Sequence, residues 1–416
     1  MESKEKFLAA LYHREGKVPL DIGGTAVSGI HAKPLQRLRE YYGLEKRPVT
    51  IIEPYQMLGR VDDDLRDAMG IDTEPLWNPY TLIGYFNEKF REWRTPWGQD
   101  VLVPEGFVTR QECGKTYIYA CGDTDYAPCA VMPEGGYFFD AIIRQNHFNE
   151  DDLKLEDNTE EFAPVSDKTL QYFKDARGAL SGKYGVVGNP GGTGIGDIAL
   201  VPGIMLREPK GIRDITEWYV STAIRQDFLH QIFEYQTNIA IKNLKSIWDV
   251  LGDAIHVAYV CGTDFGTQNF PFCSTDTFES LYMPYYKRIN GWIHDNTTWK
   301  TFKHSCGSLA PLIPSMIESG FDILNPVQWS AQGMDRRELK KTFGSDIVFW
   351  GGGVNTQSTL PFGTPEQVRS EVIECCEIFS EGGGFVFGTI HNITAEVPVE
   401  NIAAMAEAVR EFNGDK

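Results

Sequence analysis

The second half of the chain alternates short apolar stretches with longer helical patterns, and this alternation limits the fold more than any other feature. Each apolar stretch has the length and composition of a buried strand, and each stretch between carries apolar residues at helical spacing. The predicted strands are 254–260, 298–302, 321–328, 346–353 and 384–388. The predicted helices are 212–248, 276–293, 308–319, 335–343, 364–380 and 398–412. This order predicts parallel βα units.

Two further apolar stretches, near residues 18 and 185, bring the predicted strands to seven of the eight in a (β/α)8 barrel. The eighth strand has no clear position in the sequence. We therefore predict an α/β fold, a single TIM-barrel domain over residues 1–416, with an N-terminal helical extension at residues 3–13.

Residues 71–140 differ from the rest, because aromatic side chains stand among Gly and Pro in alternating runs such as 115–119. This pattern predicts hairpins and a β meander inserted in the barrel domain. Two interpretations remain open. The segment is a β-rich cover with its own small core, or it is an aromatic wall over a pocket for a flat substrate.

A barrel brings distant parts of the sequence to one mouth, since its chemistry lies at the carboxyl ends of the strands. Polar side chains occur at most of the predicted strand ends. They are Asp21, Asn189, Cys261, Asp264, Gln268, His304, Cys306, Asn325, Gln328, Asn355, Gln357, His391 and Asn392. We predict that these residues line the mouth.

His304 and Cys306 are the strongest candidates for metal binding. They are two residues apart at the end of an extended stretch, so their side chains point to the same face. An imidazole nitrogen and a thiolate sulfur suit Zn²⁺, and His391 after another apolar run is the best third ligand. The alternative is that these side chains only pack at the strand ends.

Charge and cysteine usage exclude several classes of protein. The formal net charge is −19, with 39 Lys and Arg against 58 Asp and Glu and no basic stripe, which argues against nucleic acid or an anionic membrane as partner. No apolar run is long enough to span a membrane, and the start lacks the apolar core of a signal peptide. The eight cysteines form no Cys-x-x-Cys pair. We expect a soluble cytoplasmic protein with free thiols.

Several motifs carry a resemblance to a known family. They are Gly262-Thr263-Asp264-Phe265-Gly266-Thr267-Gln268, residues 281–288, His304-Ser305-Cys306-Gly307-Ser308, residues 322–328, residues 349–357, and His391-Asn392-Ile393 with residues 397–402. On these motifs the chain resembles the uroporphyrinogen decarboxylase (URO-D) superfamily of (β/α)8 barrels, closely over about 250–405 and loosely over the first 70 residues.

Within that superfamily the chain departs from true uroporphyrinogen decarboxylases. These enzymes carry an N-terminal Arg-Gln-Ala-Gly-Arg motif, whereas this chain has residues 21–26 there, Asp-Ile-Gly-Gly-Thr-Ala, without arginine. A substrate with many carboxylates needs several cationic side chains in the mouth. The chain is more similar to the zinc methyltransferases of the superfamily, whose motif is His-x-Cys followed much later by a Cys. Here His391 stands where that last Cys would be.

This resemblance implies a bound Zn²⁺ held by His304, Cys306 and His391, with Cys261 or Asp264 as alternatives to His391. It also implies cobalamin on a partner corrinoid protein. We predict transfer of a methyl group from a small O-methyl donor of the methoxyarene type, with Asp264 and Gln268 as catalytic residues. The predicted substrate-binding residues are Asp21, Asn189, Asn325, Gln328, Asn355 and Gln357.

Three alternatives remain open from the sequence. The same zinc would also activate a thiol acceptor, as in methylcobamide:coenzyme M enzymes. A metal-free decarboxylase of a small carboxylic acid would use Asp264 to handle the proton. A binding barrel without chemistry is the third. The sequence leaves open whether the protein is a monomer or a homodimer.

Overall fold

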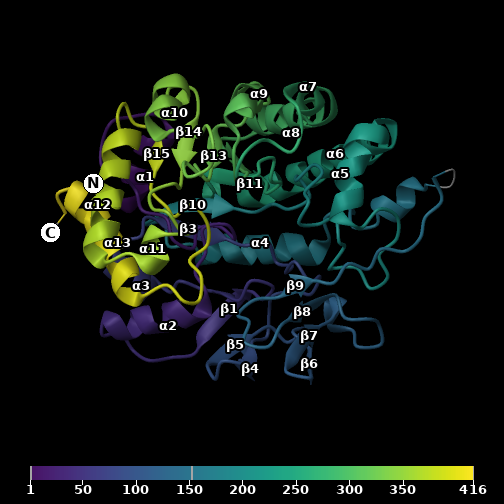
Figure 1. Cartoon of the computed structure of the whole chain (residues 1–416), viewed down its shortest axis with the longest axis horizontal. Helices are drawn as coiled ribbons and strands as arrows, with labels where there is room; N and C mark the ends of the chain where they lie inside the picture. Colours follow the sequence, from purple (N-terminus) through teal and green to yellow (C-terminus); the bar gives the residue numbers. More distant parts are fainter. Residues whose placement is uncertain (1, 151–152, 416) are drawn as a thin grey trace.

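The computed structural model describes residues 2–150 and 153–415, and its largest sheet is a parallel sheet of seven strands (Figure 1). In spatial order the strands are β15 (Phe385–Val386), β14 (Val348–Trp350), β13 (Ile323–Asn325), β12 (Lys300–His304), β11 (Val257–Cys261), β10 (Gly185–Gly188) and β3 (Thr73–Leu76). Every neighbouring pair is parallel. The α/β class and the parallel sheet are as predicted.

The segment around Leu20 joins the two edges of this sheet. Leu20 forms a parallel bridge with Phe387 after β15, and the Asp21 N–H donates to the Phe387 carbonyl at 2.8 Å. On the other side, the Asp72 N–H donates to the Leu20 carbonyl at 2.8 Å, directly before β3. The curled sheet is thereby closed in the manner of a TIM barrel. The strand that the sequence left unplaced is β3, at the start of the segment 71–140.

Helices surround the sheet, and most of them lie where the sequence predicts them (Figure 1). They are α1 (Ser3–Leu11), α2 (Ala32–Tyr41), α3 (Asp63–Met69), α4 (Asp167–Ala179), α5 (Ile215–Ile224), α6 (Gln226–Leu251), α7 (Thr275–Thr277), α8 (Met283–Asn296), α9 (Ile313–Glu318), α10 (Arg336–Phe343), α11 (Thr359–Phe362), α12 (Pro365–Phe379) and α13 (Val399–Phe412). The predicted helix 212–248 is two helices, because Arg225 leaves helical geometry at φ −127° and ψ 36°.

The interior of the barrel is filled by alternate residues of its strands, as period-two geometry requires. This cluster contains Val187, Val257, Phe302, Ile323, Val348, Trp350 and Val386. Phe7 of α1 belongs to the same cluster, with its ring centre 5.5 Å from that of Trp350. A Cβ on Gly185 would lie 2.1 Å from the Phe7 ring, so only glycine fits at this position. The N-terminal helix therefore closes one end of the barrel.

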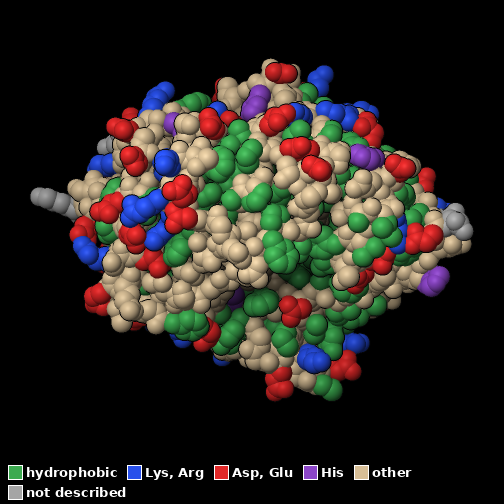
Figure 2. Space-filling model, turned by 45° about the horizontal axis from the view of Figure 1, so that its top comes forward, with side chains coloured by type: hydrophobic (Ala, Val, Ile, Leu, Met, Phe, Trp, Pro, Cys, Tyr) green, Lys and Arg blue, Asp and Glu red, His purple; other side chains and the backbone are tan. Residues whose placement is uncertain are grey.

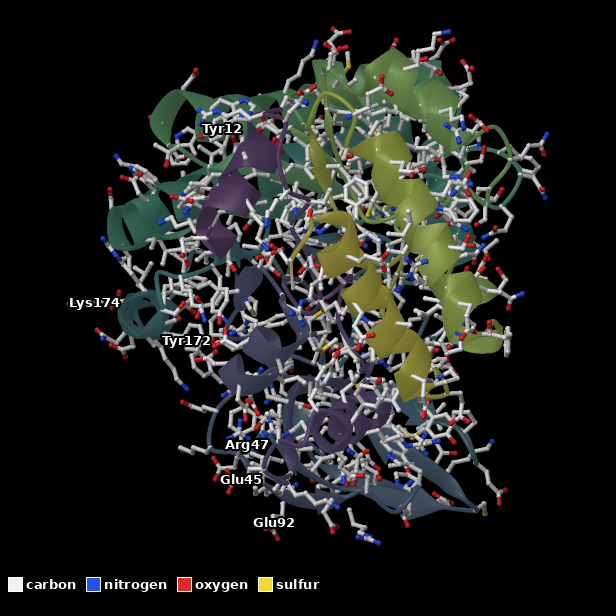
Figure 3. The ribbon with its side chains drawn as sticks, turned by 90° about the vertical axis from the view of Figure 1, so that its left-hand side faces the viewer. Tyr12, Glu45, Arg47, Glu92, Tyr172 and Lys174 are labelled. Atoms are coloured by element: carbon white, nitrogen blue, oxygen red, sulfur yellow. The ribbon has the colours of Figure 1, made fainter. Side chains whose placement is uncertain are left out.

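Two four-stranded sheets lie to one side of the barrel, at the bottom of Figure 1. One has the order β2 (Leu58–Gly59), β1 (Val49–Glu53), β5 (Asp100–Val103) and β4 (Arg91–Arg94), in which the pairing of β1 with β5 is parallel. The other is a meander of β6 (Thr109–Glu112), β7 (Lys115–Ile118), β8 (Ala130–Met132) and β9 (Asp140–Ala141). Seen from the side in Figure 3, they lie below α12 and α13, with Glu45, Arg47 and Glu92 at the lower edge.

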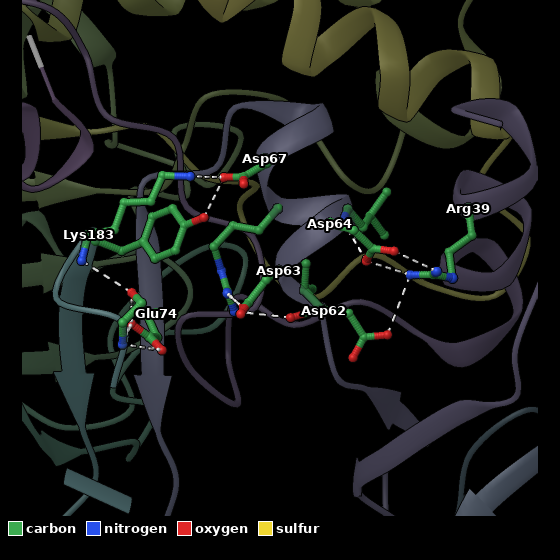
Figure 4. Close-up of polar contacts among 12 residues, drawn as sticks. Arg39, Asp62, Asp63, Asp64, Asp67, Glu74 and Lys183 are labelled. Carbon is green, nitrogen blue, oxygen red and sulfur yellow. Dashed lines mark hydrogen bonds and ion pairs between the residues drawn. The ribbon is translucent and has the colours of Figure 1, made fainter. Parts of the chain in front are cut away.

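Charged contacts of α3 connect α2 to the barrel (Figure 4). Asp64 accepts two hydrogen bonds from Arg39 of α2, each at 2.8 Å, and this pairing lowers the pKa of Asp64 to about 2. Asp67 accepts hydrogen bonds from Lys183 and from the Tyr184 hydroxyl, just before β10. Among the described residues, no helix is long and apolar enough to cross a membrane.

Candidate metal centre

Three side chains with metal-binding atoms meet at the carboxyl ends of the strands. His304 is the last residue of β12, Cys306 follows in the next turn, and His391 comes after β15. One ligand atom from each lies within 4.8 Å of the others, and Cys306 Sγ is 3.6 Å from His304 Nε2. The two imidazole rings have their centres 5.4 Å apart. The structure brings together the three predicted ligands, and their binding of a metal stays a prediction.

Asn325 at the end of β13 sets the orientation of His304. Its Oδ1 lies 2.7 Å from His304 Nδ1, and its own amide donates to the Trp350 carbonyl at 3.0 Å. The second contact fixes which end of the amide faces the histidine, so Nδ1 of His304 carries the proton. Nε2 then faces Cys306 with a free lone pair, as a metal ligand must.

Asp264 lies at the edge of this cluster, in the loop after β11. Its Oδ1 is 3.6 Å from His304 Nε2 and accepts a 2.7 Å hydrogen bond from the Cys306 N–H. Cys261, the other alternative ligand, is fully buried, with its sulfur 3.0 Å from the Tyr286 hydroxyl and 3.6 Å from Lys303 Nζ. Asp264 is therefore placed to contact a ligand or substrate at the cluster, whereas Cys261 is engaged elsewhere.

Burial determines the protonation of the cluster. It lowers the pKa of His304, against the opposing effect of the Asp264 carboxylate, and it also lowers the pKa of His391. Both imidazoles are therefore neutral near pH 7, the form that binds metals. Burial raises the pKa of the Cys306 thiol, with a further increase from Asp264. Cys306 is thus protonated until a cation takes the place of the proton.

Two amide side chains support the turn that carries Cys306. Gln328 Oε1 accepts a 2.8 Å hydrogen bond from the Gly307 N–H, and Gln328 Nε2 donates to Gln268 Oε1 at 3.1 Å. Gly307 has φ +92°, and a Cβ there would lie 2.4 Å from the Gly266 backbone. Of these two predicted site residues, Gln268 is exposed and accessible to a substrate, while Gln328 is buried under the turn.

The remaining predicted substrate-binding residues are engaged in local structure. Asp21 is buried and accepts hydrogen bonds from the Gly24 N–H, the Thr73 hydroxyl and the Trp350 indole N–H. Asn355 accepts from the N–H of Gln357, whose side chain is exposed. Asn189 lines a cavity of about 20 Å³, room for one water molecule, beside Trp77 and Tyr259. Within the part of the chain that the structure describes, these four make no hydrogen bond to His304, Cys306 or His391.

Other residues near the cluster were given no predicted role, although Asn392 was among those expected to line the mouth. Asn392 accepts from the Gly29 N–H at 2.6 Å and donates to the Ala26 carbonyl at 2.9 Å, which holds the His391 segment against the N-terminal loop. Asp197, in the loop after β10, accepts from the Gly262 N–H at 3.3 Å. Its place after a Gly-rich strand end was the signal available in the sequence. Lys303 gave no such signal, because a lysine near a strand end ordinarily reaches solvent.

The family model described as uroporphyrinogen decarboxylase (URO-D) matches residues 201–412, slightly more than half of the chain. The chain belongs to the URO-D family. The matched region contains the three residues of the metal cluster, Asp264 and β11 to β15.

Curated relatives in the URO-D family match over shorter stretches. The uroporphyrinogen decarboxylase of Methylococcus capsulatus is 29% identical over 101 residues, which is 24% of this chain and 27% of the relative. That of Legionella pneumophila (strain Lens) is 34% identical over 98 residues, 24% of this chain and 26% of the relative. The alignments thus span about a quarter of the length of these relatives.

A solved structure resembles the chain along its whole length. It is a methyltransferase from Methanosarcina mazei, with a TM-score of 0.55 over 99% of both chains and 16% sequence identity. At this level of identity the likeness shows a shared fold.

Proposed function

We propose that this URO-D family protein is a zinc-dependent methyltransferase that moves a methyl group from a small O-methyl donor to the cob(I)alamin of a corrinoid protein. The observation that supports it most is the convergence of two imidazoles and one thiol at the mouth of the barrel. A structural neighbour that is a methyltransferase is consistent with it.

The donor set fits zinc. Two neutral imidazole nitrogens and a cysteine sulfur are common zinc ligands, and three protein ligands leave a fourth position for a substrate. His304 Nε2 is free because Nδ1 is held by Asn325, and the Cys306 sulfur lies 3.6 Å from it. When bound, zinc would supply Lewis acidity that stabilises the negative charge of the leaving oxygen.

The residues of this chain would handle the donor and its proton. In the transfer, the bond between the methyl carbon and oxygen breaks, a carbon–cobalt bond forms on the partner, and the donor oxygen takes up a proton. We assign that proton to Asp264, and two observations support this: its Oδ1 is 3.6 Å from His304 Nε2, and its side chain is about one third exposed. The exposed Gln268 amide, held by Gln328, would orient the donor.

The mouth offers little to a substrate with many carboxylates. The polar side chains that the structure describes at the strand ends are acids, amides, hydroxyls, histidines and cysteines, and Lys303 is fully buried behind them. Hydrophobic side chains gather around a hollow on the face shown in Figure 2. These features favour an uncharged, partly apolar donor over a polycarboxylate.

Two other functions use the same residues. A methylcobamide:thiol methyltransferase would need the same ligand set. A metal-free decarboxylase of a small carboxylic acid is favoured by the partial similarity to uroporphyrinogen decarboxylases, and it would rely on Asp264 without zinc.

Elemental zinc content of the protein, purified without tag or chelator, tests the proposal. We expect about one zinc per chain, strongly reduced in His304→Ala and Cys306→Ala. His230→Ala and Cys273→Ala, at half-buried positions away from the cluster, should keep it. The zinc-loaded protein should then form methylcobalamin from cob(I)alamin and a methoxyarene, followed by absorbance. Protein that neither contains zinc nor takes it up would contradict the mechanism, and CO₂ release from small acids would be assayed instead.

A further inference from the structure

A buried lysine lies directly behind the metal cluster. Lys303 precedes His304 in β12, and its side chain is fully buried. Its Nζ donates to the Thr263 carbonyl at 2.6 Å and to the His304 carbonyl at 2.7 Å, and it lies 3.6 Å from Cys261 Sγ. Three acceptors around one amino group match the three N–H donors of an ammonium ion.

Within residues 2–150 and 153–415, this ammonium makes no direct ion pair. In the described part of the chain, no carboxylate oxygen lies within 4.0 Å of Lys303 Nζ. A buried charge without a partner is strongly destabilising, so its presence calls for compensation from charges nearby. A lysine at this position is thus unexpected for a side chain that only fills space.

Two carboxylates bracket the turn that Lys303 holds. Asp197 accepts from the Gly262 N–H at 3.3 Å, Lys303 donates to the next residue, Thr263, and Asp264 follows and accepts from the Cys306 N–H at 2.7 Å. Burial raises the pKa of Asp197, and the Lys303 ammonium opposes that rise. Asp264 raises the pKa of Asp197 further, as expected for like charges near one another.

We propose that Lys303 is a positioning residue: it fixes residues 262–264 against the turn of His304 and Cys306, and its charge balances the Asp197 and Asp264 carboxylates. The backbone contacts place Asp264 beside His304 Nε2. The positive charge keeps the two acids close together beside the thiol of Cys306. Removing the charge therefore destabilises the loop and the cluster together.

A double-mutant cycle separates the charge from the packing. Lys303→Met keeps the length of the side chain and removes the charge, and Asp197→Asn removes one of the carboxylates that it balances. Urea unfolding is measured for four metal-free proteins. They are the wild type, the two single variants and the double variant. Lys300→Met, in the same strand but paired with Asp322, is the matched control.

We expect Lys303→Met to lower the urea midpoint clearly more than Lys300→Met does. Asp197→Asn should recover at least half of that loss in the Lys303→Met background, while it leaves the wild type unchanged or less stable. This rescue depends on charge, because replacing a carboxylate with an amide of the same size restores no packing. Equal effects of Asp197→Asn in both backgrounds would overturn the proposal.

Zinc affinity supplies a second readout, which rests on the proposed function. Competition with a chromophoric chelator should show roughly tenfold weaker zinc binding by Lys303→Met, recovered by Asp197→Asn. If the wild type binds no zinc, the proposed function fails and the unfolding cycle still decides the role of Lys303.

If Lys303→Met does not fold, the double variant should fold. Failure of both, with Lys300→Met folded, counts against charge balance.

Discussion

Asn325 is the residue on which the orientation of His304 depends. Replacing it with Leu removes the acceptor for His304 Nδ1 and frees the ring to turn or to move its proton to Nε2. We expect zinc affinity to fall about 10- to 100-fold, as for other groups that orient metal ligands. Titration against a chelator measures this. Asn325→Asp keeps an acceptor and should lose less, and an equal loss in both variants would contradict the orienting role.

Glu53 of β1 makes stability depend on pH. Burial raises its pKa to about 7 from its ordinary value of 4.5, against hydrogen bonds from the N–H groups of Gln56 and Tyr55. The folded state therefore holds this proton more tightly than the unfolded state. The contribution of Glu53 to stability is greatest below pH 4.5 and is lost as pH rises through 7, a change of about 3 kcal/mol.

Urea unfolding at pH 5.5 and pH 8 tests this dependence. Glu53→Gln cannot ionise, so it should show a smaller loss of stability between the two pH values than the wild type does. Glu92→Gln, at an exposed position of β4, should behave like the wild type. If the unfolding free energy of wild type and Glu53→Gln changed equally with pH, the Glu53 carboxylate would not be the source of the pH dependence.

At the scale of elements, the turn after β12 requires a glycine. Gly307 has φ +92°, and an added Cβ would lie 2.4 Å from backbone atoms of Gly266. Gly333 has φ +74° and no atom within 4 Å of an added Cβ, so it isolates the conformational effect. Gly333→Ala should lower the unfolding free energy by about 1 kcal/mol. Gly307→Ala should lower it by at least about 3 kcal/mol, and this variant should also lose its bound zinc. Equal losses would mean that the close approach relaxes freely.

Helix α1 contributes to the core of the barrel through Phe7, which is fully buried. Phe7→Ala leaves a cavity between α1 and Trp350 and should lower the unfolding free energy by about 3 to 5 kcal/mol. Tyr12→Ala, 48% exposed just after the same helix (Figure 3), should cost less than about 1 kcal/mol. Thermal or urea unfolding compares the two, and similar midpoints would rule out α1 as part of the core.

Elements with strong periodicity were predictable, and the exceptions have physical causes. β11 to β15 and the helices between them lie where apolar runs alternate with helical patterns. β3 was missed because Thr73-Glu74-Pro75-Leu76 contains an acid and a proline, and its recognition depends on its place beside β10. The predicted strand near residue 18 makes a single bridge at Leu20.

The same limits apply to the site. The cluster of His304, Cys306 and His391 was predictable, because strand side chains alternate and barrel chemistry lies at strand ends. The structure has these three residues close together. Asp21, Asn355 and Gln328 satisfy the same rule, yet their hydrogen bonds are to the protein itself. Which strand-end residue faces a substrate depends on packing between distant segments, and periodicity carries no information about that.

At the scale of the whole molecule, Asp21 joins parts of the ring that are far apart in sequence. It accepts from Thr73 at the start of β3 and from Trp350 of β14. Asp21→Ala leaves these buried donors without an acceptor, so we expect a loss of about 3 kcal/mol or more in unfolding free energy. Zinc content per folded chain should stay unchanged. A stable variant with altered substrate affinity would instead support the predicted binding role.

The pairing of Leu20 with Phe387 has a consequence for how the protein is made. The two residues leave the ribosome far apart in time, by roughly 20 to 70 seconds at 5 to 20 residues per second. Until then the growing chain has an incomplete ring, with one β edge unpaired and the barrel interior open. His391 emerges just after Phe387, so the nascent chain has no complete metal cluster before closure. Synthesis rate and chaperone access during this interval should therefore limit the yield of folded protein.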